Sequence, residues 1–184
     1  MIITITGKPC SGKGTVSKLL CEKYNFEYIC TGDMFREFAK KFGYNSVLEF
    51  QQNYKDIKEI DNLVDKKTED IGKTRIKENI VIDSRLAWHF VPNSFKVFID
   101  IDWTTAGERL LSANRQNEKA ASIEQAAKDL ETRWNVENER YTNIYNTNNL
   151  NLSNYDFVIS SNNLTPEEIV DKIYKKYTEF MLKA

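Results

Sequence analysis

The chain has 184 residues, 41% of them hydrophobic, and its 26 basic and 27 acidic residues leave a formal net charge of −1. This length is enough for one hydrophobic core and too short for two of ordinary size, so we predict a single domain over residues 1–184. The balanced charge provides no general attraction for nucleic acid or an anionic membrane, and no apolar run approaches the roughly 18 residues of a membrane-spanning helix. We therefore expect a cytoplasmic protein without a nucleic-acid or membrane partner. Since no helix carries a long unpaired apolar seam, we also expect a monomer.

The first predicted element is a β-branched strand over residues 2–6, and a glycine-rich loop follows it directly. After the loop, the spacing of Val16, Leu19 and Leu20 indicates a helix. A strand, a loop with a lysine near its end and a helix form the context expected of a phosphate-binding loop. The loop consists of Gly7, Lys8, Pro9, Cys10, Ser11, Gly12, Lys13, Gly14 and Thr15.

The chemistry of this loop points to a nucleotide. Glycines at both ends let backbone N–H groups point inward, and the helix that opens at Lys13 directs the positive end of its dipole at the same place. Lys13 adds an ammonium group that can follow the β- and γ-phosphates. A tight strand-to-helix turn without a ligand is the alternative, but it explains neither the lysine nor the spacing. Gly14 stands where most such loops carry a hydroxyl residue that binds Mg²⁺, so we expect no direct protein ligand for the metal from this position.

Further strands and helices alternate along the chain. The second strand, residues 27–30, leads through Thr31-Gly32-Asp33 into a helix with apolar residues at helical spacing. Three more strands are predicted at 79–83, 95–101 and 155–160, and helices at 103–115, at 122–145 with Ser122 and Gln125 as a capping box, and from Thr165 onward with Glu168 reaching back to the cap. Five strands alternating with helices predict a parallel sheet covered on both faces, with ligands at the carboxyl ends of the strands.

Polar residues follow two of these strand ends. Arg36 lies in the helix after the second strand, and Asp83 and Arg85 follow the third. The planar guanidinium group matches phosphate oxygens two at a time, so Arg36 and Arg85 could bind a second phosphate group, that of an acceptor. Asp83 is suited to hold a Mg²⁺-bound water or to orient the nucleophile. A structural ion pair between Asp83 and Arg85 is the alternative interpretation.

A third polar cluster is predicted on the long helix. Arg133, Glu137 and Arg140 lie on one stripe beside its apolar face, either as a ladder of salt bridges or as part of the site. Arg109 and Arg115 frame the turn before that helix. Arginines around one short polar segment are typical of a lid that closes over phosphates.

With these motifs in this order, the chain resembles the nucleoside monophosphate kinases, and most specifically the short cytidylate kinases of the archaeal type. The resemblance covers nearly the whole length. It is carried by the phosphate loop with its GKGT ending, by TGDMFRE at 31–37, by DSRLAW at 83–88, and by the Arg133-x-x-x-Glu137-x-x-Arg140 stripe. Trp88 lies closer to the arginine than is usual in the family, and Ser84 replaces a common glycine.

The resemblance implies a three-layer P-loop fold and Mg²⁺-assisted, in-line transfer of the ATP γ-phosphoryl group to CMP or dCMP. The implied insertions are an acceptor-side helical segment at 43–78, and a lid with its following helix at 109–145. The catalytic residues implied are Lys13, Asp83, Arg109 and Arg115, and the acceptor-binding residues are Thr31, Asp33, Arg36, Arg85, Arg133, Glu137 and Arg140. A kinase for another monophosphate or small acceptor remains an alternative, as does an ATP-binding regulatory module without a small acceptor.

Overall fold

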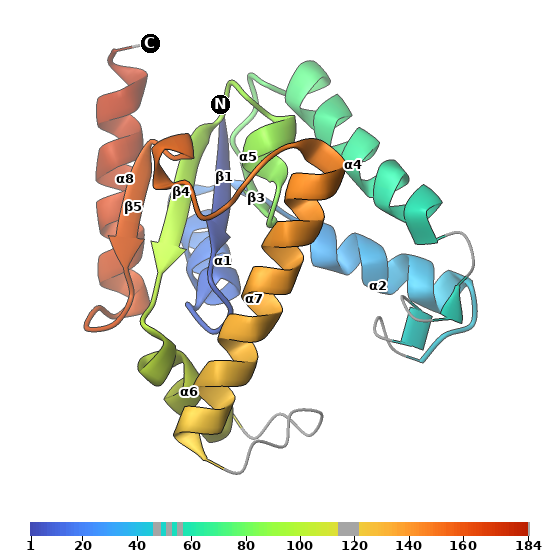
Figure 1. The fold of residues 1–184 in the computed structure, drawn as a ribbon. Coiled ribbons are helices and arrows are strands. Elements are labelled where there is room, and N and C mark those ends of the chain that lie inside the picture. The colour runs from blue at the N-terminus through green and yellow to red at the C-terminus, as the bar shows by residue number, and fades with distance from the viewer. Residues whose placement is uncertain (46–48, 51–52, 55–56, 114–121, 184) are drawn as a thin grey trace.

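The fold is that of a computed structural model, which describes residues 1–45, 49–50, 53–54, 57–113 and 122–183. Its centre is a five-stranded, all-parallel sheet with the strand order β2-β3-β1-β4-β5 (Figure 1). The predicted parallel sheet is therefore confirmed, with strand ends one or two residues from those expected for the later strands. The strands are β1 (Ile2–Gly7), β2 (Glu27–Cys30), β3 (Ile80–Asp83), β4 (Phe95–Asp100) and β5 (Phe157–Ser160).

Helices cover both faces of this sheet, as the alternating pattern predicts (Figure 1). On one face, α1 and α8 pack on the sheet around fully buried side chains such as Ile5, Leu20 and Ile173. On the other face, α2, α4 and α5 pack around Ile80 and Ile82, and α7 contributes the buried Trp134. The helices are α1 (Lys13–Tyr24), α2 (Thr31–Lys41), α4 (Ile57–Thr74), α5 (Ala87–Phe90), α6 (Trp103–Ser112), α7 (Ile123–Tyr145) and α8 (Pro166–Met181), with a short 3₁₀ turn, η1 (Leu152–Asn154).

Capping boxes were predicted at the starts of two helices, α7 and α8. At α8, Thr165 accepts a hydrogen bond from the backbone N–H of Glu168, whose side chain accepts one from Thr165 N–H, so this capping box is confirmed. At α7, Ser122 accepts from the N–H of Gln125, but the Gln125 side chain donates to Asp129 instead of returning to the cap. The second half of that predicted capping box was therefore wrong, because a carboxylate one helical turn away offers Gln125 a charged acceptor.

Two other helix boundaries differ from expectation. Helix α2 begins at Thr31, directly after β2, so the residues predicted as a strand-exit loop form its first turn. Helix α6 ends at Ser112, and the end predicted at Arg115 lies outside the described residues. In consequence, Thr31 and Asp33 lie on the same helix as Arg36 rather than on a loop before it.

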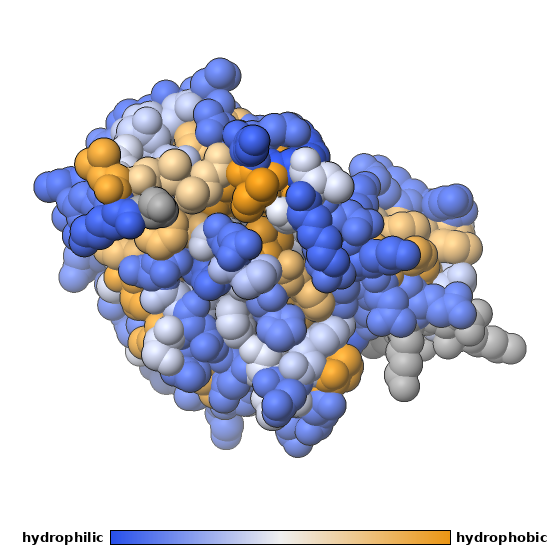
Figure 2. All heavy atoms as spheres, turned by 90° about the horizontal axis from the view of Figure 1, so that it is seen from above, coloured by the Kyte–Doolittle hydropathy of each residue, from blue (hydrophilic) through white to orange (hydrophobic). Residues whose placement is uncertain are grey.

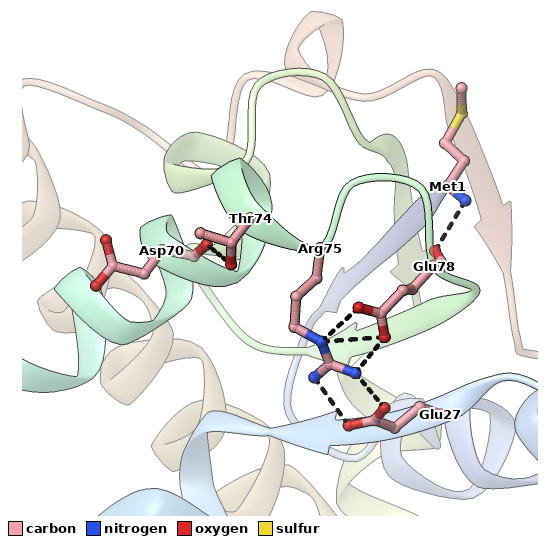
Figure 3. A network of polar contacts seen from close by, with 6 residues as sticks. All are labelled: Met1, Glu27, Asp70, Thr74, Arg75 and Glu78. Carbon is pink, nitrogen blue, oxygen red and sulfur yellow. Dashed lines mark hydrogen bonds and ion pairs between the residues drawn. The ribbon is translucent and has the colours of Figure 1, made fainter.

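A network of ion pairs closes the end of the sheet away from the glycine-rich loop (Figure 3). The Arg75 guanidinium donates to both carboxylate oxygens of Glu27 and both of Glu78, at 2.5–3.1 Å. The amino terminus donates to the Glu78 carbonyl at 2.8 Å. The network thereby joins the residue after α4 to the starts of β1, β2 and β3.

The surface is chiefly hydrophilic, and hydrophobic groups reach it in separate patches on the face seen in Figure 2. Exposed apolar side chains include Leu150, Leu152 and Val158 near the β5 edge of the sheet. Among the helices that the structure describes, none has the length and apolar character needed to cross a membrane.

Candidate active site

The glycine-rich loop connects the end of β1 to the start of α1, where the sequence placed it. Cys10 and Gly12 have left-handed backbone conformations, with φ of 62° and 85°, which let the chain reverse direction before the helix. A Cβ at Gly7 would stand 2.4 Å from the Ile99 carbonyl oxygen, so only glycine fits there. The Ser11 hydroxyl oxygen is buried and makes no hydrogen bond to the part of the chain that is described.

A cavity of about 300 Å³ opens on this loop. Besides residues 7–15, it is lined by Arg85 from the segment after β3 and by Leu130 and Arg133 from α7. Four cationic residues, Lys8, Lys13, Arg85 and Arg133, therefore border one hollow at the carboxyl end of the sheet. A cavity with this charge suits a polyanion, which the arginines can bind by two parallel hydrogen bonds each.

Lys13, which lines the cavity, forms an ion pair with Asp83 at the end of β3. The Lys13 Nζ atom lies 2.5 Å from Asp83 Oδ1, and the Asp83 side chain is only 5% exposed. The second carboxylate oxygen, Oδ2, accepts a hydrogen bond from the Tyr28 hydroxyl at 3.1 Å. The partner of Asp83 is thus the loop lysine rather than Arg85, which differs from the structural ion pair weighed as an alternative.

Arg85 instead contacts a carboxylate of the α7 stripe. Its guanidinium is paired with Glu137, which also accepts a hydrogen bond from Arg133 Nε at 3.3 Å. Burial lowers the pKa of Arg85, because removing water disfavours its charged form. The stripe is therefore more than a surface ladder: it connects α7 to the strand end that carries Arg85.

Farther along α7, two side chains reach across to α4. Arg140 forms an ion pair with Asp61, whose side chain is 16% exposed, and the Tyr145 hydroxyl donates to Asp65 Oδ2 at 2.5 Å. Burial raises the pKa of both aspartates above its ordinary value. Three arginines of the predicted acceptor site, Arg85, Arg133 and Arg140, are thus each already paired with a carboxylate.

The remaining predicted acceptor residues lie on α2. Arg36 is paired with Asp33 one turn earlier on the same helix, and both side chains are more than half exposed. Thr31 begins that helix. None of the three lines the described cavity, so their role in binding an acceptor stays a prediction.

Two further cations of the predicted site, Arg109 and Lys8, contact groups beside the glycine-rich loop. Arg109 donates to the Cys10 carbonyl at 3.3 Å and to Ser161, through its Oγ at 3.1 Å and its carbonyl at 2.6 Å, which braces the loop against the end of β5. The Lys8 ammonium lies 2.7 Å from Asp100 and 4.9 Å from the centre of the Trp103 ring. The second predicted lid arginine, Arg115, lies outside the described residues.

Sequence reasoning missed three side chains near this site: Tyr28, Asp61 and Asp65. Tyr28 was treated only as a strand residue, although the alternation of side chains along β2 puts it on the same face as Cys30, which is paired in register with Asp83. The aspartates stand in a long polar segment with many other charges, where no local pattern distinguishes them.

The residues present fit a nucleoside triphosphate. Three features are suited to phosphate oxygens: the buried Ser11 hydroxyl, which has no hydrogen-bond partner among the described residues, the inward-curled loop, and the lysine at the start of α1. For Mg²⁺, Asp83 offers a carboxylate beside the loop, whereas Gly14 offers none; a Cβ added there would lie 3.5 Å from Asp83 Oδ2. Asp83 is therefore the residue suited to hold a metal or its bound water.

Comparison with known proteins supplies the family. A family model described as "AAA domain" matches residues 3–159. A cytidylate kinase of Methanococcus aeolicus is 35% identical over 162 residues, 88% of each chain, and an S-adenosylmethionine-dependent nucleotide dehydratase of Lacinutrix mariniflava is 35% identical over 95% of this chain but only 35% of its own length. Among solved structures, a shikimate kinase from Bacteroides thetaiotaomicron has a TM-score of 0.66 at 15% identity, over 98% of both chains.

Fold and site together define a P-loop α/β protein, in which the glycine-rich loop and the arginine-lined cavity share the carboxyl edge of a parallel sheet. Several archaeal cytidylate kinases match at 30–35% identity over most of their length and of this chain. The chain belongs to the family of these short archaeal-type cytidylate kinases, as its motifs predict.

Proposed function

We propose that this protein transfers the γ-phosphoryl group of ATP to CMP or dCMP. The observation that carries the proposal is the cavity in which the glycine-rich loop, Arg85 and Arg133 meet, because it brings a donor-phosphate cradle and acceptor-side cations to one place. The names of the family's members supply the acceptor: those relatives are cytidylate kinases. The matched part of the Lacinutrix relative is about a third of that protein, so its dehydratase activity is not carried over.

In this proposal the loop N–H groups and Lys13 bind the donor phosphates, and Lys13 follows the γ-phosphoryl group during transfer. Arg85 and Arg140 hold the acceptor phosphate, while Arg133 and Glu137 contact its sugar. Arg36, with Thr31 and Asp33 beside it, would complete the acceptor side from α2. Arg109 and Arg115 would stabilise the moving phosphoryl group as lid arginines, for which Arg109 must exchange its contacts with Ser161 and Cys10.

Mg²⁺, when bound, would neutralise charge on the phosphate oxygens. Asp83 is the residue suited to hold it or its water, once Lys13 turns from the carboxylate to the phosphates. The segments at 43–78 and 109–145 would act as the acceptor-side wall and the lid. Their closure would exclude water, so that ATP is transferred rather than hydrolysed.

The test is a coupled assay of ADP release with Mg-ATP and one acceptor at a time: CMP, dCMP, UMP, AMP, GMP, shikimate or none. The proposal expects strong stimulation by CMP or dCMP over all others. Equal rates with every acceptor, including none, would contradict it and favour an ATP-binding module. If only UMP, AMP or a non-nucleotide stimulated ADP release, the protein would still be a kinase for a small molecule, but the acceptor in the proposal would be wrong.

A further inference from the structure

Tyr28 contacts Asp83 from β2, the edge strand of the sheet. In the β2–β3 register, Tyr28 stands opposite Val81 and Cys30 opposite Asp83, so the tyrosine ring lies diagonally beside the aspartate on one face. Its hydroxyl donates to Asp83 Oδ2 at 3.1 Å.

Asp83 has two anchors in this structure, one on each oxygen. Lys13 Nζ lies 2.5 Å from Oδ1, and Tyr28 holds Oδ2. The two anchors differ in what they do when ATP binds. A lysine in this loop serves the donor phosphates, so binding draws the ammonium away from Oδ1. Tyr28 belongs to a strand hydrogen-bonded to β3 and stays beside Asp83.

We propose that Tyr28 is a positioning residue of the phosphoryl-transfer site, which holds the Asp83 carboxylate in place when Lys13 leaves it for the phosphates of ATP. The inference rests on the proposed function. Without the hydroxyl, a carboxylate released by Lys13 is free to rotate about its side-chain torsions, and the group suited to Mg²⁺ loses its fixed direction.

A purely structural role for Tyr28 is the competing explanation. The ring packs against the core under α1, and Lys18 Nζ lies 5.7 Å from its centre. Replacement by phenylalanine keeps the ring and removes only the hydroxyl, so packing is preserved while the bond to Asp83 is lost. Tyr28→Phe therefore separates the two roles.

The chain offers a matched control. Tyr24 also donates its hydroxyl to an aspartate, Asp171 Oδ1, at 2.9 Å, but on the exposed surface between α1 and α8. Tyr24→Phe removes the same kind of hydrogen bond away from the cavity. Any effect shared by both variants is a general consequence of losing a tyrosine–aspartate bond.

The experiment measures kcat, KM for each substrate and Tm of the wild type and both variants, and titrates ATP by calorimetry with and without Mg²⁺. For Tyr28→Phe we expect kcat to fall about tenfold, the usual effect of one hydrogen bond to a charged group, with KM for CMP unchanged. We also expect the tightening of ATP binding by Mg²⁺ to shrink several-fold. Tyr24→Phe should match the wild type in both measurements.

Three results would overturn the inference: an unchanged kcat and Mg²⁺ effect in Tyr28→Phe, a loss confined to KM for CMP, or a fall in Tm that accounts for the whole loss of activity. The calorimetric titration needs no acceptor. If wild-type protein binds Mg-ATP but phosphorylates none of the acceptors tested, the proposed function fails while the Tyr28 comparison still decides the inference.

Discussion

The Nζ atom of Lys13, a residue that lines the cavity, lies 2.5 Å from Oδ1 of Asp83, across 70 residues of sequence. The pair joins the start of α1 to the end of β3 and leaves an almost fully buried carboxylate neutralised by a loop lysine. In the proposed function, a phosphate group of ATP competes with that carboxylate for the same ammonium. The ion pair with Asp83 therefore keeps the Lys13 ammonium next to the glycine-rich loop.

Replacing Lys13 by methionine removes this cation while keeping most of its hydrophobic chain. We expect kcat to fall roughly 100- to 1,000-fold, the effect of losing one preorganised charge donor at a transition state. The steady-state assay with CMP measures it. Lys23→Met is the control, because Lys23 forms a similar 2.5 Å pair with Asp171 on the surface, and it should leave kcat unchanged. A kcat loss below threefold in Lys13→Met would contradict the assigned role.

Arg85→Ala should raise KM for the acceptor about 10- to 100-fold with little change in ATP affinity, because it removes one charge-assisted contact on the acceptor side. Kinetics with varied CMP and a separate ATP titration measure the two effects. The variant also leaves Glu137 without its Arg85 partner, so Tm should be recorded in parallel. An equal loss of ATP binding would count against separate donor and acceptor sites.

Asp61→Asn should lower KM for the acceptor by several-fold. The substitution replaces the charged partner of Arg140 with a neutral amide, so an acceptor phosphate competes with a weaker hydrogen bond for the guanidinium. Asp70→Asn, an exposed change on the same helix, should have no effect (Figure 3). A higher KM in Asp61→Asn would mean that Asp61 itself contributes to acceptor binding.

Arg75→Ala should lower Tm by a few degrees at pH 7 without altering KM for either substrate, because the network that it breaks lies at the opposite end of the sheet (Figure 3). Arg75 holds the pKa values of Glu27 and Glu78 below their ordinary 4.5. Stability from a lowered carboxylate pKa is present above the unfolded value and is lost as pH falls through the folded one.

Thermal unfolding of the wild type and Arg75→Ala should therefore differ at pH 7. The gap should begin to shrink as the pH falls through the ordinary glutamate pKa of 4.5, and should close only below the lowered pKa of the folded wild type, where the glutamates are protonated in both proteins. High salt should narrow the gap at pH 7, since the pairs are partly exposed. A gap independent of both pH and salt would assign the effect of Arg75 to packing.

Much of the fold could be predicted because its signals are local. The apolar run at 80–82 and the Thr165-Pro166 helix start each act within a few residues, and both were found where the sequence indicated. The predicted hydrogen bond from the Gln125 side chain back to the cap of α7 was not found, because the nearby Asp129 carboxylate accepts a hydrogen bond from that side chain instead. Local patterns identify what a residue can do and leave open which of several nearby partners it takes.

The same division holds for the site. By itself the sequence determined the phosphate loop, since its backbone conformation and its lysine lie within nine contiguous residues. Only the tertiary structure decided that Asp83 pairs with Lys13 and Tyr28, that Glu137 takes Arg85, and that Arg140 takes Asp61. The residues of each pair are 52 to 79 residues apart along the chain. They come into contact because of strand register and helix packing, and no short stretch of sequence encodes that geometry.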